Sequence, residues 1–363
     1  MFIYIFTLSL LFFVGLFEVN GSFSKKNHKI TFLLVILFFW ILSFVRWKTG
    51  TDWESYYNFF SNSDTYDEFV EKAFEPLYTY LGYIIKQFSS EYWFFLCIVG
   101  LLIFPLTSTT IYKYSTFPFV SLLVYLLLRR ADIFFVRESI ALAFCFYSIK
   151  FIRNRKFWKF LILVLIGFGF HNSTIVFLPA YYIYSLKIDI KKSILFVAII
   201  GLFMIYIQGW LTSVVGDVAS VLGDSFYDKT DKYIERGYDI YGASSVESTL
   251  VKGAINRIAM LLFFFLGFRK YYDDDHFKGM INIYLFSLLL FFLLAPLSLT
   301  LNRLCNSYEM IAILLIGYTF DSLSAKSRPL VFLLVYVYIV IRFCMGTLFG
   351  AYADEFVPFK TIF

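Results

Sequence analysis

Apolar runs of nearly membrane-spanning length recur along almost the whole chain, from residue 2 to residue 350, with short polar breaks between them. A helix rises about 1.5 Å per residue, so roughly 20 apolar residues cross a hydrocarbon core of about 30 Å. Helices also satisfy every backbone polar group internally, as a bilayer requires. The runs therefore predict an all-α, polytopic integral membrane protein of about 12 transmembrane helices, in a single transmembrane domain over residues 1–363.

Composition supports this prediction and removes several functional classes. Of 363 residues, 60% are hydrophobic and 16% charged, so water is not the main solvent. The net charge of +6 comes from clusters between apolar runs, which topology explains better than a nucleic-acid partner does. Motifs for nucleotides and for soluble hydrolases are absent from the sequence. The 48 Phe and 28 Tyr residues suit lipid-facing surfaces and interfacial belts, although AT-rich coding DNA explains them equally well.

Metal and cofactor sites are not predicted. The four cysteines lack metal-binding spacing, and His28 and His276 lie in polar breaks distant from His171. Residues 273–275 are three successive aspartates, which are predicted to be a solvated connection between lysines.

Lysine and arginine gather in a few polar breaks, which assigns those breaks to the cytoplasmic side. The breaks so assigned contain Lys25, Lys26 and Lys29; Arg153, Arg155, Lys156 and Lys159; Lys187, Lys191 and Lys192; Arg269, Lys270 and Lys278; and Lys326 and Arg328. The first run, residues 2–17, lacks a cleavage site and is predicted to be a retained helix with its N-terminus outside. Two long acidic segments, residues 46–75 and 212–249, are predicted to be external, periplasmic loops.

One parity problem arises between Arg46 and Arg137, which are both predicted outside. Three candidate spans separate them, residues 76–88, 92–109 and 117–128, whereas two ends on one side require an even number. The first run is the shortest and carries polar residues near its end. This run or the third is therefore predicted to be re-entrant or to lie in the interface.

Five polar residues at the ends of apolar runs need an explanation, because an ionisable group there costs several kcal/mol unless it is paired or solvated. They are Arg46, Asp52, Arg137, His171 and Arg303, and the predicted topology places all five outside. Guanidinium groups present paired donors that suit a diphosphate, and a histidine beside them suits a base. The competing interpretation is structural: snorkelling anchors, with Glu138 and Glu309 as counter-ions, and an ion pair of Asp132 with Arg129 and Arg130.

At these residues the sequence resembles the EpsG-like and Wzy-type family of bacterial polysaccharide polymerases. The resemblance runs over most of the chain, and its most specific blocks lie between Arg46 and Tyr57 and between Arg137 and His171. Its landmarks are Arg46, Gly50, Asp52, Tyr56 or Tyr57, Glu75-Pro76, Arg137-Glu138, Ile140-Ala141, His171-Asn172-Ser173, Arg303 and Tyr308. Members usually carry glutamine after the second arginine, so the role of Glu138 stays open between substrate contact and pairing with Arg137.

The resemblance implies a membrane glycosyltransferase, GT-C-like in fold, that joins undecaprenyl-diphosphate-linked oligosaccharides into O-antigen or a related polysaccharide. It would work at the outer face of the bacterial inner membrane without metal, nucleotide or other cofactor. The implied catalytic residues are His171, Asp52, Arg137 and Arg303, with His171 preferred as base and Asp52 in a positioning role. The implied substrate-binding residues are Arg46, Gly50, Tyr56, Tyr57, Glu138, Asn172 and Tyr308. Membrane lipid is a further partner, and a chain-length regulator protein is a possible one.

Two other functions fit the same residues. A flippase or transporter for lipid-linked glycan would also hold a diphosphate, but it should carry polar residues deep in the membrane, and few are found. A ligase-type membrane transferase, which moves finished glycan to another acceptor, is poorly separated from a polymerase by sequence alone.

Overall fold

The computed structural model describes residues 1–187, 189–207, 210, 213, 246–295, 299–350 and 352–362. In this part of the chain the elements are helical, apart from one isolated bridge between Arg46 and Thr361. The predicted all-α class is therefore confirmed. The second predicted loop, residues 212–249, falls mostly outside the described residues.

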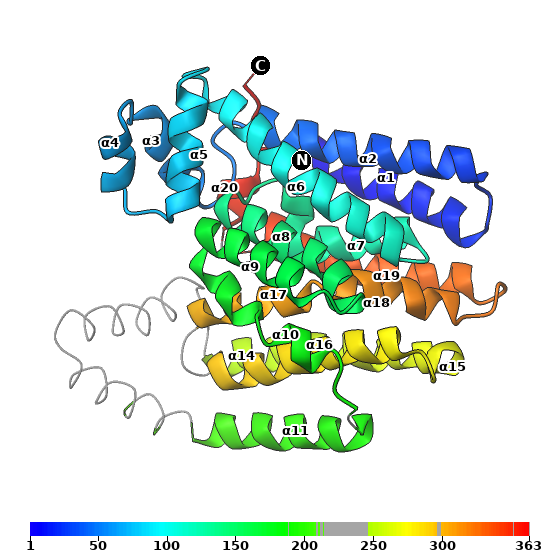
Figure 1. Cartoon of the computed structure of the whole chain (residues 1–363). Helices are drawn as coiled ribbons and strands as arrows, with labels where there is room; N and C mark the ends of the chain where they lie inside the picture. The colour runs from blue at the N-terminus through cyan, green and yellow to red at the C-terminus, as the bar shows by residue number, and fades with distance from the viewer. Residues whose placement is uncertain are drawn as a thin grey trace.

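Most helices run side by side in one bundle, with their axes horizontal in Figure 1. Its longer helices are α1 (Phe2–Val19), α2 (Lys25–Val45), α6 (Tyr92–Tyr114), α8 (Arg137–Arg153), α9 (Phe157–Phe170), α11 (Ile190–Tyr206), α14 (Val246–Phe264), α16 (Asp275–Leu294) and α19 (Arg328–Phe343). The shorter ones are α7 (Pro118–Arg129), α10 (Ala180–Ile183), α15 (Phe268–Tyr271), α17 (Asn306–Glu309), α18 (Ala312–Asp321) and α20 (Ala353–Phe356). Five further segments are η1 (Arg130–Asp132), η2 (Asn172–Phe177), η3 (Phe265–Gly267), η4 (Leu299–Cys305) and η5 (Cys344–Leu348).

Six helical segments in the described part are long and apolar enough to cross a membrane. They are Phe2–Val19, Lys25–Val45, Tyr92–Tyr114, Val251–Tyr271, Asp275–Leu294 and Arg328–Leu348. The chain is thus a multi-pass membrane protein, whereas the number of about 12 spans stays a prediction. An apolar run does not by itself give a spanning helix. Helices α7 and α18 lie in equally apolar stretches but have only 12 and 10 residues.

Three short helices form a cap at one end of the bundle: α3 (Trp53–Ser61), α4 (Tyr66–Glu71) and α5 (Pro76–Lys86) (Figure 1). Thr65 and Glu68 start α4 with a capping box, in which each side chain accepts from the other's backbone N–H. Aromatic rings fill the interior of the cap, as in the stacked pairs Phe59–Tyr78 and Phe60–Phe95. Part of the aromatic surplus is therefore the core of a small helical unit and does not face lipid.

The cap bears on the parity problem. Helix α5 has 11 residues and lies beside α3 and α4 at the same end, while α6 and α7 run away from the cap and back (Figure 1). If α6 and α7 are the two passes, Arg46 and Arg137 end on one side, so we infer that the first candidate, residues 76–88, is the one that does not cross. We call this end the cap end and the opposite end the basic end.

The basic end holds the turns that carry the lysine and arginine clusters, at 20–24, 154–156, 184–187, 272–274 and 322–327 (Figure 1). All of the basic residues used for the topology thus share one end, as predicted. The aspartate run has a structural role there, because Asp274 accepts the N–H of Phe277 at 2.8 Å and caps α16. Groups of side chains that could hold a metal ion are absent from the described residues.

Candidate functional site

The candidate site lies at the cap end, where the starts of α5 and α8 meet the turn after α9. Arg137 is the first residue of α8, and its Nη1 lies 2.6 Å from Oε2 of Glu75, the residue that precedes α5. The other oxygen of Glu75 accepts the backbone N–H of Asn172 at 3.1 Å. One buried carboxylate therefore joins the arginine to the histidine turn.

His171 ends α9 and begins η2 in an extended conformation. Its Nδ1 lies 2.7 Å from Ser173 Oγ, and the Ser173 N–H also points to Nδ1 at 3.3 Å. Burial lowers the pKa of His171, the charge of Glu138 opposes that shift, and Arg137, Glu75 and Arg303 contribute smaller effects. The histidine therefore lies within the electrostatic reach of two arginines and two carboxylates.

One nitrogen of the Arg137 guanidinium has no hydrogen-bond partner among the described residues. This nitrogen is Nε, which is buried, and the guanidinium plane lies over the Phe74 ring at 4.7 Å. Tyr56 borders the same guanidinium from α3, and burial raises the pKa of its phenol to about 12, so the hydroxyl stays protonated at neutral pH. A buried N–H without an acceptor is costly, which points to an oxygen ligand at this position.

Glu138 pairs with Arg129 and not with its neighbour Arg137. Its Oε2 lies 3.3 Å from Arg129 Nη1, and its Oε1 accepts from Asn306 Nδ2 at 2.7 Å. Glu138 thereby joins α8 to α17, next to η4. The interpretation of Glu138 as the counter-ion of Arg137 is wrong in this respect.

Arg129 is the centre of a buried polar network below the site. Besides Glu138, it reaches Asp132 Oδ1 at 3.1 Å and Ser139 Oγ at 3.1 Å, and Tyr125 donates to the other oxygen of Asp132 at 2.7 Å. The predicted ion pair of Asp132 with Arg129 and Arg130 is confirmed for Arg129. Arg130 donates to Thr347 Oγ1 and to the Gly346 carbonyl, both at 3.0 Å. The turn at residues 130–132 is strained, because its φ values are 48°, 53° and 52°, which L-residues rarely adopt. The polar network around Arg129 stabilises this turn. That turn redirects the chain from α7 into α8 and so sets the position of Arg137.

Arg303 lies in η4, is exposed, and has no ion pair with any described residue. It acts electrostatically on both Glu138 and His171, so it belongs to the same cluster. Glu309, expected as its counter-ion, pairs with Arg257 at 2.8 Å instead. Arg257 also approaches Asn302 at 3.5 Å and thereby supports η4. The sequence did not predict a role for Arg257, since this arginine lies inside an apolar run and no recognisable motif surrounds it.

The remaining predicted residues lie around this cluster. Arg46 is fully buried and donates to the carbonyls of Ser43 and Thr49, at 3.2 and 2.7 Å. Gly50 has φ of 110°, and an added Cβ would lie 3.4 Å from Arg46 Nη1. Asp52 precedes α3 without capping it and interacts electrostatically with Arg46.

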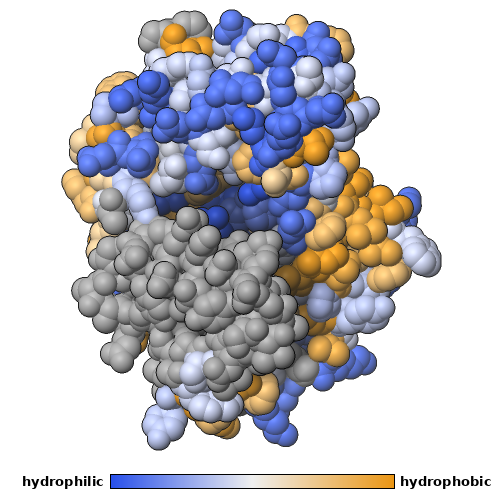
Figure 2. Space-filling view, turned by 90° about the vertical axis from the view of Figure 1, so that its left-hand side faces the viewer, coloured by the Kyte–Doolittle hydropathy of each residue, from blue (hydrophilic) through white to orange (hydrophobic). Residues whose placement is uncertain are grey.

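Tyr57 and Tyr308 stand apart from Arg137. Tyr57 stacks on Trp53, with ring centroids 4.7 Å apart. Tyr308 is buried and donates to the Val176 carbonyl at 2.6 Å, which supports the histidine turn from below. Seen from the cap end, the surface over the cap is largely hydrophilic, and a hydrophilic hollow opens beneath it (Figure 2).

A family model described as the EpsG family matches residues 29–361, nearly the whole chain. The chain belongs to the EpsG family. Searches of curated proteins and of solved structures each return no match. Membership in the EpsG family gives this multi-pass membrane protein a role like that of a polysaccharide polymerase, an enzyme of the glycosyltransferase type.

Proposed function

We propose that this EpsG-family protein polymerises oligosaccharide repeat units linked to undecaprenyl diphosphate, at the outer face of the bacterial inner membrane. The observation that carries the proposal is the convergence of Arg137, His171 and Arg303 at the cap end, opposite the basic turns. By the positive-inside rule the basic end is cytoplasmic, which makes the cap end external.

In the proposed reaction a hydroxyl of the incoming repeat unit attacks the anomeric carbon of the growing glycan. A new glycosidic bond forms, the bond from that carbon to the lipid diphosphate breaks, and the diphosphate leaves with the bonding electrons. Arg137, whose Nε has no hydrogen-bond partner in the described structure, and Arg303, which has no ion pair with any described residue, would stabilise the charge that develops on the leaving diphosphate. Arg46, Gly50, Tyr56, Tyr57, Glu138, Asn172 and Tyr308 stay predicted substrate-binding residues.

The proton of the attacking hydroxyl would pass to His171. In the tautomer whose Nδ1–H donates to Ser173 Oγ, 2.7 Å away, the lone pair of Nε2 is available to the substrate. The Ser173 N–H, 3.3 Å from Nδ1, favours the other tautomer, so the proposed step requires this weaker contact to open when substrate binds. Asp52 would position substrate from the start of α3.

The test uses purified protein and its lipid-linked repeat unit, with products separated by length. We expect a ladder of longer glycans, which Arg137→Ala, Arg303→Ala and His171→Ala each abolish. Two matched controls lie at the basic end, the exposed Arg269→Ala and His276→Ala, which should keep the ladder. Relocation of intact substrate between leaflets would instead indicate a flippase, and transfer to a different acceptor would indicate a ligase.

A further inference from the structure

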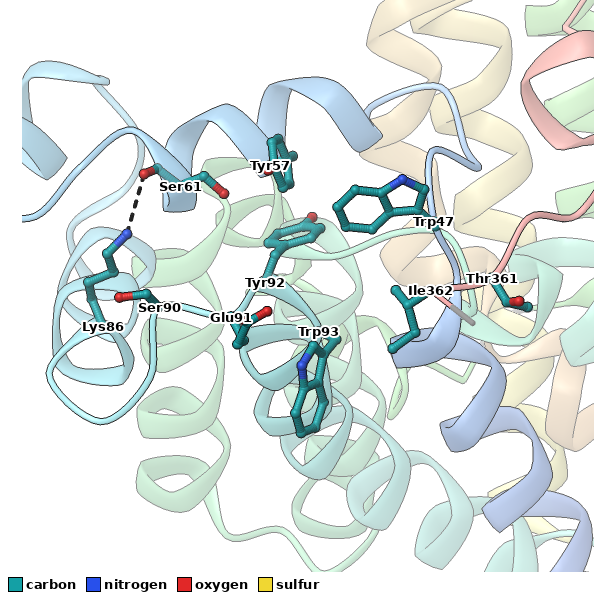
Figure 3. Close-up of a pocket in the computed structure, with 10 residues that line it drawn as sticks. All are labelled: Trp47, Tyr57, Ser61, Lys86, Ser90, Glu91, Tyr92, Trp93, Thr361 and Ile362. Atoms are coloured by element: carbon teal, nitrogen blue, oxygen red, sulfur yellow. Dashed lines mark hydrogen bonds between the residues drawn. The ribbon is translucent and has the colours of Figure 1, made fainter.

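A second cavity lies at the cap end, beside the cluster described above and separate from its charged groups. Its volume is about 710 Å³, within the roughly 300–1,000 Å³ typical of small-ligand sites. The residues that line it are Trp47, Tyr57, Ser61, Lys86, Ser90, Glu91, Tyr92, Trp93, Thr361 and Ile362. Figure 3 shows the rings of Trp47, Tyr92 and Trp93 around a common space, with Ile362 beside them.

The walls of this cavity are held firmly. The loop with Trp47 is bound to the end of the chain, since its N–H donates to the Lys360 carbonyl at 2.9 Å and the Ile362 N–H donates to Val45 at 2.9 Å. On the other side, Lys86 Nζ donates to the carbonyls of Phe60 and Ser61 at 3.0 and 3.3 Å. The cavity is therefore preformed, which lowers the entropic cost of binding.

Three features of the lining define the ligand. Several aromatic faces offer stacking surfaces for the C–H faces of sugar rings. Tyr92 is 3% exposed, so its ring is held in place as the inner wall of the cavity. Glu91 is exposed, and its carboxylate has no ion pair or hydrogen bond among the described residues. The cavity thus combines apolar ring faces with an accessible hydrogen-bond acceptor, the Glu91 carboxylate, as a saccharide requires.

The charge of the cavity lining narrows the class of ligand further. Among the described lining residues Lys86 is the one cation, and its three donors are already used by two carbonyls and by Asp64, at 3.3 Å. The free charge of the lining is therefore the carboxylate of Glu91, which accepts from sugar hydroxyls and repels an anion. This balance favours an uncharged sugar over a uronic acid or a phosphate.

The cavity is also close to the proposed reaction site. Its inner wall, Tyr92, interacts electrostatically with Arg46 and with Tyr56, and Tyr56 borders Arg137. We propose that this cavity is a glycan subsite, which binds an uncharged saccharide segment of the substrate while its diphosphate lies at Arg137 and Arg303. The inference rests on the proposed function for the identity of that substrate.

Binding can be tested without turnover. The probe is the free oligosaccharide released by mild acid from the host's own lipid-linked repeat unit, which carries neither lipid nor diphosphate. We expect saturable binding to the full-length protein in lipid nanodiscs. Trp93→Ala should weaken it about tenfold or more, because an exposed stacking face is lost. Trp158→Ala, which removes a still more exposed tryptophan on α9, is the control and should change it less than about twofold.

Glu91→Gln tests the charge of the ligand. It should weaken binding of an uncharged segment, because a carboxylate accepts hydrogen bonds more strongly than an amide. Tighter binding in Glu91→Gln would indicate an anionic ligand and overturn the inference, as would wild-type protein without saturable binding or an unaffected Trp93→Ala variant. Polymerisation is measured in parallel. Polymer without oligosaccharide binding refutes the subsite alone, and binding without polymer refutes the proposed function alone.

Discussion

Glu75 Oε2 lies 2.6 Å from Arg137 Nη1, while Glu75 Oε1 accepts the Asn172 N–H at 3.1 Å. The two partners of this carboxylate lie 62 and 97 residues further along the chain. Glu75 therefore sets the distance between the arginine and the histidine turn, and its removal should affect the reaction more than the fold.

We predict that Glu75→Gln lowers the polymerisation rate about tenfold to a hundredfold, because a misplacement of about 1 Å in a reacting group costs about that much. The amide keeps an acceptor for Asn172 but loses the charge that orients Arg137. Rates of chain elongation measure the effect, with Glu71→Gln on the exposed end of α4 as the control. An unchanged rate in Glu75→Gln would remove Arg137 from the proposed mechanism.

The pH dependence of the reaction should report His171. Burial lowers its pKa below the ordinary value of about 6.5, so the imidazole is neutral at pH 7 and ready to accept a proton. Activity should be constant around neutral pH and fall only when the pH drops through this lowered pKa.

The Glu138→Gln variant tests whether His171 is the group that titrates in the acid limb of the pH profile. The negative charge of Glu138 favours the imidazolium and raises the pKa of His171, so its loss should move the acid limb to still lower pH. The measurement is the pH profile of kcat for wild type and variant. An acid limb that moves to higher pH, or that stays in place, would assign the base to another residue, with Asp52 the first candidate.

Arg129 should matter for stability rather than for substrate. It is 3% exposed and contacts Asp132, Glu138 and Ser139 through three different nitrogens. Its replacement by alanine leaves the buried carboxylate of Asp132 and the half-buried one of Glu138 without their cation, a loss of about 3–5 kcal/mol. Arg129→Lys should rescue little, because one ammonium cannot reproduce the planar fork. Thermal unfolding in detergent is the readout, and Arg269→Ala should leave it unchanged.

The sequence was sufficient to predict the shared end of the basic turns and the proximity of Arg137 to His171. The distribution of charge between polar breaks and the apolar runs are local properties of the sequence, so they can be read without knowing how the helices pack. The partners of the charged groups were not predictable in the same way. Arg137 with Glu75, Glu138 with Arg129 and Glu309 with Arg257 are tertiary pairs, whereas sequence reasoning chose neighbours in the chain.

The cap shows a second limit of sequence reasoning. Residues 76–88 are apolar enough to resemble a span, but their rings pack on those of α3, as in the pair Tyr78–Phe59. Periodicity and hydropathy show how apolar a segment is, but they do not show whether lipid or other parts of the protein cover it. The contacts of Trp47 with the last residues of the chain were likewise invisible, because the positions lie more than 300 residues apart.

The position of α5 gives the sharpest test of topology. Asn62 lies before α5 and Ser90 after it, and both are exposed. In a background in which the native cysteines are replaced, Asn62→Cys and Ser90→Cys should react with an impermeant thiol reagent from the same side of intact cells, since α5 does not cross. Cysteines at Asn154 and Lys326, two exposed positions at the basic end, should react only after permeabilisation. Labelling of positions 62 and 90 from opposite sides would make α5 a span. Arg46 and Arg137 would then lie on different sides of the membrane, and no single diphosphate could reach both.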